Sequence, residues 1–166
     1  MRAAELALKE LQRELTLLEN SRMDPAVIAE LAFQASDRAL NDILGMTAEL
    51  SFNSSAEQVK LFKEILPAFY ARKEYYRLLN YAVTFCPDTA ATKEKLLFWP
   101  KQAERLENFR SKNAEFLNYH ESNRTDKDEF YYGTESDNQF VEILGNLWAR
   151  EQYRLYALGK IEELSK

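Results

Sequence analysis

Turn-forming residues are scarce along this chain. Its 166 residues include only four Gly and four Pro, whereas a β-sandwich or β-barrel needs a turn signal every ~8–12 residues. The connections must therefore be few, and the elements between them long. Apolar residues recur at spacings of three and four, the repeat of an amphipathic α-helix. These features predict an all-α fold: an antiparallel bundle of about five helices, forming a single domain over residues 1–166.

The first two helices have clear boundaries in the sequence. One is expected over Ala3–Asn20, with four leucines on one face: Leu8, Leu11, Leu15 and Leu18. Asp24-Pro25 predicts the next start, because Asp caps free amide groups and Pro fits the first helical position. This second helix should end near Leu50. Its apolar stripe is Ile28, Ala32, Ala35, Ala39, Ile43, Met46 and Leu50, and the small residues in its middle would let another helix approach closely.

The third helix contains a proline. Ser54 and Glu57 match a capping box, and the helix should run from there to about Phe85. Pro67 lies inside it, removes one backbone donor and crowds the preceding turn, so we expect a kink or a short break there.

The last two helices are separated by a polar connector, residues 121–129. The fourth should begin between Asp88 and Pro100 and end near His120. A short aromatic segment at 130–133 should fold back onto the core, because adjacent exposed rings are unusual. Thr134 or Ser136 could cap the fifth helix, Ser136 in a capping box with Gln139. Its expected stripe is Val141, Leu144, Trp148, Leu155 and Leu158, and its end is near Leu164.

Net charge and cysteine content restrict the kind of binding surface and the cellular compartment that are expected. The formal net charge is −5, which disfavours a dedicated DNA-binding surface. Cys86 is the only cysteine, so no intrachain disulfide can form and a reducing cytoplasm is expected. The least charged stretch, 78–86, is about half the ~20 residues of a membrane span, and no signal peptide is evident.

Residues that carry catalytic chemistry are few. A single histidine, His120, excludes most zinc sites and the Glu-x-x-His motifs of di-iron bundles. No phosphate-binding glycine motif occurs. Cys86 and His120 could form a nucleophile–base pair, but a half-buried cysteine and a surface histidine are the simpler interpretation. We therefore expect no enzyme activity, no cofactor and no metal.

One stretch, residues 60–77, interleaves basic and aromatic side chains. The candidate interaction surface is Lys63, Tyr70, Arg72, Lys73, Tyr75 and Arg77. Such a face can bind nucleic acid through stacking and phosphate contacts, or an acidic protein. Alternatively, Tyr76 packs inward beside Phe69 while the basic residues are merely solvated. A further hypothesis is a small-molecule pocket between helices, lined by Trp99, Trp148 and tyrosines.

Two ordered aromatic motifs resemble the RteC family. The first is Leu61-Phe62-Lys63-Glu64-Ile65-Leu66-Pro67, followed by Tyr70 and by Tyr75-Tyr76. The second is Phe109, Asn113, Phe116 and Tyr119, then Thr125, Asp128 and Tyr131-Tyr132. The acidic, Leu-rich opening and the last helix match in layout, so the resemblance spans nearly the whole chain. One departure is Glu121, where the family commonly has Arg.

The ordered aromatic motifs, with no catalytic constellation, lead us to expect a non-catalytic regulatory domain that acts through a protein partner or through self-association. RteC proteins regulate the excision of conjugative transposons that carry tetracycline resistance, by activating transcription of the excision operon. The family also implies two parts, an all-helical N-terminal part and a winged-helix-like C-terminal part that binds DNA. The C-terminal part would begin near Lys166, where this sequence stops, so we expect only the N-terminal part here.

Overall fold

Five long helical rods make up the described part of the chain. The structure is a computed structural model that describes residues 2–123 and 130–166. The helices are α1 (Arg2–Glu19), α2 (Pro25–Thr47), α3 (Ser55–Lys60), the π-helical turn η1 (Leu61–Ile65), α4 (Leu66–Phe85), α5 (Thr92–Asn123) and α6 (Glu135–Leu164). The segments α3, η1 and α4 follow one another without a gap and form one rod. No strand occurs in the described residues, so the predicted all-α class and the number of long helices are confirmed.

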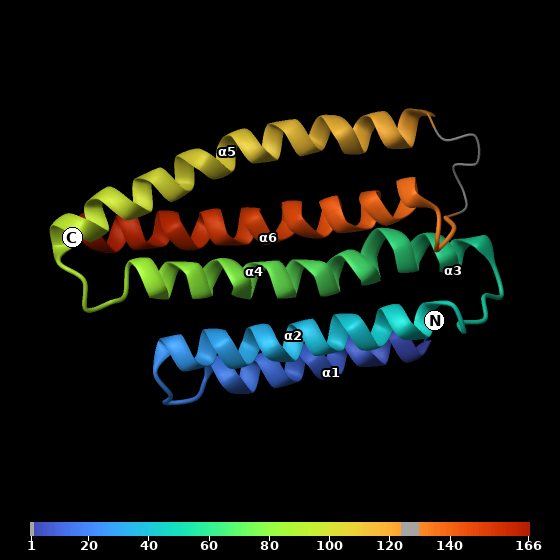
Figure 1. Cartoon of the computed structure of the whole chain (residues 1–166), viewed down its shortest axis with the longest axis horizontal. Coiled ribbons are helices and arrows are strands. Elements are labelled where there is room, and N and C mark those ends of the chain that lie inside the picture. The colour runs from blue at the N-terminus through green and yellow to red at the C-terminus, as the bar shows by residue number, and fades with distance from the viewer. Residues whose placement is uncertain (1, 124–129) are drawn as a thin grey trace.

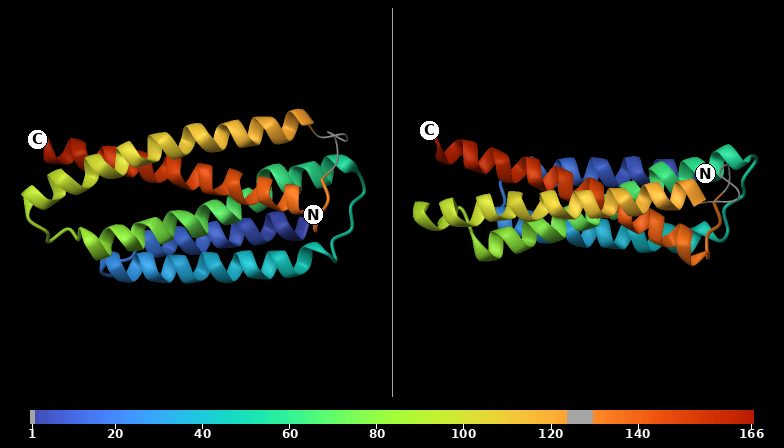
Figure 2. Two further views of the ribbon diagram at one scale, coloured as in Figure 1. Left: turned by 45° about the horizontal axis from the view of Figure 1, so that its top comes forward. Right: turned by 90° about the horizontal axis from the view of Figure 1, so that it is seen from above.

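The rods lie side by side along one long axis (Figure 1). Rods that follow each other along the chain run antiparallel, and α4 and α6, which α5 separates in sequence, run in the same direction (Figure 1). The main packing partners are α1 with α2, α2 with α4, α4 with α6, and α6 with α5. The left view of Figure 2 shows α5 on one side of the molecule and α1 with α2 on the other.

Local sequence signals explain the starts of α2 and α3. The Asp24 side chain accepts a hydrogen bond from the Ala26 amide at the start of α2 (2.9 Å). Ser54 caps α3 by accepting from the Glu57 amide (3.3 Å), and Glu57 in turn accepts from the Asn53 amide (2.9 Å). The second predicted capping box is wrong, because Thr134 is the N-cap residue of α6 and Ser136 already lies inside that helix.

The irregularity expected at Pro67 takes the form of a wider turn. Pro67 cannot donate to the carbonyl four residues before it. In η1 the Leu66 amide donates instead to the carbonyl of Leu61, five residues earlier. Such a π turn makes room for the proline ring while the helix continues.

Buried side chains form two clusters. The larger one joins α1, α2, η1, α4 and the start of α6, and includes Leu11, Leu15, Ile43, Phe62, Phe69 and Phe140. The smaller one lies among α4, α5 and α6 and consists of Ala82, Trp99, Leu106, Tyr153 and Ala157. In α2, the buried Ala29, Ala32 and Ala35 fit the predicted close approach of another helix, which is α4.

The buried face of α6 differs from the predicted one. Val141 is buried as expected, but Trp148, Leu155 and Leu158 are exposed. The face that packs inward follows a four-residue spacing: Val141, Gly145, Ala149, Tyr153 and Ala157. Small residues replace leucines on this face because α6 lies very close to α4. The segment 130–133 also folds back only in part, since Phe130 is buried whereas Tyr131 and Tyr132 are exposed.

Candidate interaction surface

The six residues predicted to form an interaction surface all lie on the rod η1–α4, but they contact different neighbours. Lys63 lies on η1 and the other five on α4. Their contacts reach each of the other long helices.

Lys63 connects η1 to the end of α5. Its Nζ lies 2.9 Å from Glu121 Oε2, and also 5.3 Å from the centre of the Phe130 ring, a cation–π contact. Glu121 is the position at which the sequence departs from the family pattern, and here its negative charge has a basic partner on the neighbouring helix.

Arg72 and Lys73 connect α4 to the first two helices. Arg72 donates to Gln12 Oε1 on α1 through Nε (3.0 Å) and Nη2 (2.7 Å), and burial lowers the pKa of its guanidinium. Lys73 Nζ lies 2.9 Å from Asp37 Oδ1 on α2. Both basic groups are therefore engaged inside the chain, which differs from the simple solvated face considered from sequence.

Arg77 belongs to a charged group between α4 and α6. Its guanidinium pairs with Glu74 one turn earlier, and Glu74 Oε1 also accepts from Arg150 Nη1 at 2.8 Å. The Arg150 guanidinium lies over the Phe109 ring, 4.0 Å from its centre. Burial raises the pKa of the Glu74 carboxyl, but the hydrogen bonds from both arginines outweigh burial, and the pKa lies below its ordinary value.

The tyrosines of the predicted surface are half-buried. Tyr70 lies against Gly145 of α6. The Tyr75 ring meets Tyr76 edge-on, with 5.1 Å between ring centres, and burial raises the pKa of the Tyr75 hydroxyl to about 12. Tyr76 is buried and donates its hydroxyl to Glu19 at the end of α1, which agrees with the alternative in which this ring packs inward.

A buried polar pair lies where α5 ends and α6 begins. His120 Nε2 is 3.4 Å from Asp137 Oδ1, and both side chains are almost completely buried. Asp137 Oδ2 also accepts from the Tyr131 amide (2.8 Å). Three phenylalanine rings surround the imidazole, with centres 4.9 to 6.4 Å away: Phe116, Phe130 and Phe140. The prediction of a surface histidine is therefore wrong.

Comparison with known proteins places the chain in a family. The family model for RteC protein matches residues 60–153, which is more than half of the 166 residues. This chain belongs to the RteC family. Comparisons with curated proteins and with solved structures find no match.

Residues from both family motifs of this RteC-family chain pack in the same core cluster, which includes Phe62 and Phe116. From the first motif, Phe62 is buried and stacks on Phe130, with 5.8 Å between ring centres. From the second, Phe116 lies beside His120. Tyr119 is exposed, and Thr125 and Asp128 lie outside the described residues. Phe62 and Phe116 thus contribute to the core beside the buried His120–Asp137 pair, together with Phe130 and Phe140.

Cys86 and His120 lie at opposite ends of α5. Cys86 precedes α5, and His120 is in its last turn. At 1.5 Å per residue, the 28 steps along the helix from Thr92 to His120 span about 42 Å, so the two side chains form no nucleophile–base pair. Burial raises the pKa of the Cys86 thiol. Within residues 2–123 and 130–166, no group of three or more His, Cys, Asp or Glu side chains is placed to hold a metal ion.

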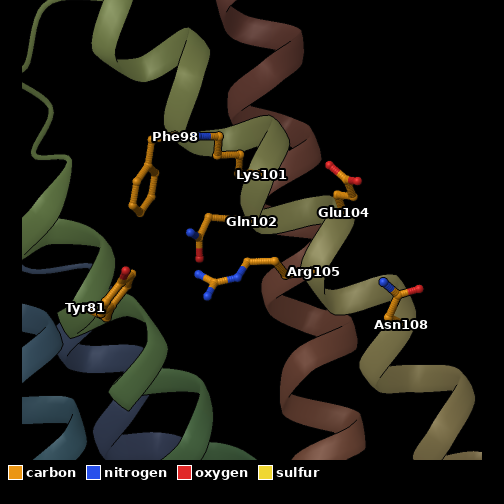
Figure 3. Close-up of a pocket in the computed structure, with 7 residues that line it drawn as sticks. All are labelled: Tyr81, Phe98, Lys101, Gln102, Glu104, Arg105 and Asn108. Carbon is orange, nitrogen blue, oxygen red and sulfur yellow. The ribbon is translucent and has the colours of Figure 1, made fainter.

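The two tryptophans predicted to line one pocket lie apart. Trp99 is buried and lines a cavity of about 260 Å³ with Cys86 and Tyr156, whereas Trp148 is exposed on α6 and lines neither this cavity nor the larger hollow. That larger hollow, of about 550 Å³, lies between α4 and α5 (Figure 3). Among the helices that the structure describes, none has the length and apolar character required to cross a membrane.

Proposed function

We propose that this chain is a non-catalytic, helical regulatory domain of an RteC-type transcription regulator, and that it acts through contact with a protein partner or a second copy of itself. Membership of the family supports the regulatory role. The observation that carries the contact role is an accumulation of exposed apolar side chains at one end of the bundle.

We call this end the apolar end. The helices α1, α4 and α6 finish there, and α2 and α5 begin there (Figure 1). Its exposed large apolar residues are Leu17, Met23, Val27, Leu31, Tyr81, Phe85, Leu96, Leu97, Leu155 and Leu158. Phe85 is 66% exposed and Leu97 59%. Of the sixteen large apolar residues that are exposed in the described part of the chain, these ten lie toward this end, and exposed apolar surface of this kind can be buried against another protein.

The family context suggests what such contacts regulate. We propose that they serve transcription control of the excision operon of a tetracycline-resistance conjugative transposon. In this proposal DNA is read by a separate winged-helix-like part, as in the family, and the helical domain transmits the regulatory contact. A cytoplasmic location, expected from the single Cys86, fits this role.

Direct nucleic-acid binding through residues 60–77 is the weaker alternative. Lys63, Lys73 and Arg77 are each ion-paired with an acidic side chain of the same chain, so contact with phosphates would require those pairs to break. A fluorescence anisotropy titration with duplex DNA at low salt distinguishes the two proposals. Saturable binding that weakens steeply as salt rises would favour the nucleic-acid role over the contact role.

Site-specific photo-crosslinking tests the contact role. A photoreactive benzoyl-phenylalanine is placed at Leu97 in the apolar end, and in a matched variant at Leu6, which is 53% exposed and lies at the opposite end. We expect irradiated cells to give one defined adduct from position 97, identified by mass spectrometry as a transcription-related protein or as a second copy of the chain. No adduct, or the same adducts from both positions, would contradict the proposal.

A further inference from the structure

The larger hollow lies between α4 and α5, and both of these helices pack against α6. Its volume of about 550 Å³ falls within the range of small-molecule sites. It is lined by Tyr81, Phe98, Lys101, Gln102, Glu104, Arg105 and Asn108 (Figure 3).

One wall of the hollow is aromatic. The Tyr81 and Phe98 rings are within 25° of parallel, with 6.2 Å between their centres, and Tyr81 also contacts Phe85 at 4.6 Å. Tyr81 is 40% exposed, so part of its ring is open to the hollow. Planar rings in this arrangement favour offset stacking with a further aromatic group.

Positive charge also lines the hollow, on the α5 side. The Arg105 side chain points from α5 across the hollow toward Tyr81, and Gln102 lies beside it (Figure 3). Neither Arg105 nor Lys101 forms an ion pair with any residue that the structure describes, although Arg110 and Arg154 nearby both have acidic partners. Glu104 lies at the rim, and its carboxylate points away from Tyr81 (Figure 3).

We propose that this hollow binds a small planar aromatic carboxylate. The ring of the ligand would stack on Tyr81 and Phe98, while its carboxylate would accept hydrogen bonds from the guanidinium of Arg105 and from Lys101. Gln102 Oε1 already accepts from the Tyr153 hydroxyl (3.2 Å), which orients the amide and leaves its NH₂ group to donate. The hollow has two basic side chains, Arg105 and Lys101, and one acidic side chain, Glu104, at its rim. This balance suits a ligand with one negative charge better than a polyphosphate.

The charge requirement is tested with a pair of probes that share one ring system. Isothermal titration with naphthalene-2-carboxylate should show saturable binding with a Kd on the order of 1 mM, which weakens in high salt. Amide shifts in a ¹⁵N–¹H spectrum should centre on the helix turns around Tyr81 and Arg105. The neutral naphthalene-2-methanol should bind at least about five times more weakly. Absence of saturation, or equal binding of acid and alcohol, would overturn the proposal.

Two variants test the residues. Arg105→Gln should weaken binding of naphthalene-2-carboxylate roughly 5–10-fold, since hydrogen bonds to charged groups are the stronger class. The matched control is Lys112→Gln, which removes an exposed, unpaired cation from the same helix outside the hollow and should leave the Kd unchanged. Equal losses in both variants would indicate attraction to the net charge alone and would overturn the site. Arg105 and Lys112 are exposed, so both variants should keep the fold, which circular dichroism verifies.

Discussion

Gly145→Ala should destabilise the protein, although alanine is the better helix former. A Cβ at position 145 would lie 2.4 Å from Tyr70 Cβ and 2.7 Å from the Pro67 carbonyl oxygen. Ordinary contact begins near 3.4 Å, so α4 and α6 would have to separate by about 1 Å. Because the opposing atoms belong to backbone and to a Cβ, they cannot move aside as a flexible side chain could.

The expected magnitude follows from two opposing effects. Overpacking costs about 1–3 kcal/mol or more, whereas replacing glycine inside a helix gains about 1 kcal/mol. Because the added Cβ would lie close to main-chain atoms, the overpacking cost of Gly145→Ala should be near the upper end of its range. We therefore expect a net loss of about 1–3 kcal/mol in the free energy of unfolding. For a chain of this length the melting temperature would fall by roughly 3–10 °C.

Thermal and urea unfolding followed by circular dichroism measure this loss. Gly159→Ala on the same helix is the matched control, because a Cβ there meets nothing within 4 Å. The control should keep or raise the melting temperature. If Gly145→Ala were as stable as Gly159→Ala, the close packing of α6 on α4 would be refuted.

Three further predictions concern buried polar groups. Glu74→Gln removes the charge that two arginines contact and should cost about 1–2 kcal/mol, whereas Glu10→Gln, in an exposed pair, should produce no measurable change in urea unfolding. Asp137→Ala should lower the free energy of unfolding by about 2–4 kcal/mol, because it removes the partner of a buried imidazole and a backbone amide, while Asn138→Ala should stay within 0.5 kcal/mol; equal effects would contradict the assigned role of the pair. Burial raises the pKa of the Tyr75 hydroxyl from 10.0 to about 12, so the unfolded chain loses this proton first, and the contribution of Tyr75 to stability should fall by about 1–2 kcal/mol as pH rises from 10 to 12. Burial also raises the pKa of the Tyr76 and Tyr153 hydroxyls, which adds to the total fall. Urea unfolding across this range checks the fall, and Tyr75→Phe should reduce it; a pH-independent result would contradict the burial of this ring.

Signals that act over a few residues predicted the helices well. Asp24-Pro25 starts α2, Ser54 caps α3, and Pro67 marks the irregular turn. Each of these effects depends on neighbouring residues alone, so sequence contains all the information required. The start of α5 was harder to predict because Pro100 resembles a helix start, and the structure places it inside the helix.

Features that depend on which helices pack together could not be predicted. Leucine spacing suggested that Leu155 and Leu158 face inward, but the approach of α4 to Gly145 selects the face of small residues instead. By sequence His120 lies at the expected end of a helix, next to a polar connector, and only the return of Phe130 and Asp137 from the next segment buries it.

The contacts of the candidate interaction surface could not be predicted from sequence either. Residues 60–77 could be identified as basic and aromatic, but their partners lie far away in sequence. Arg72 reaches Gln12, Lys73 reaches Asp37, and Lys63 reaches Glu121. Whether these six residues also contact another molecule stays a prediction.

Transcription from an excision-operon promoter measures the contact role most directly. The regulator carrying Leu97→Asp in the apolar end is compared with one carrying Leu6→Asp at the opposite end. The two leucines are similarly exposed, 59% and 53%, so neither change should disturb the fold. We expect Leu97→Asp to abolish most of the regulated transcription and Leu6→Asp to retain it. Full transcription with Leu97→Asp, at an equal protein level, would contradict the account.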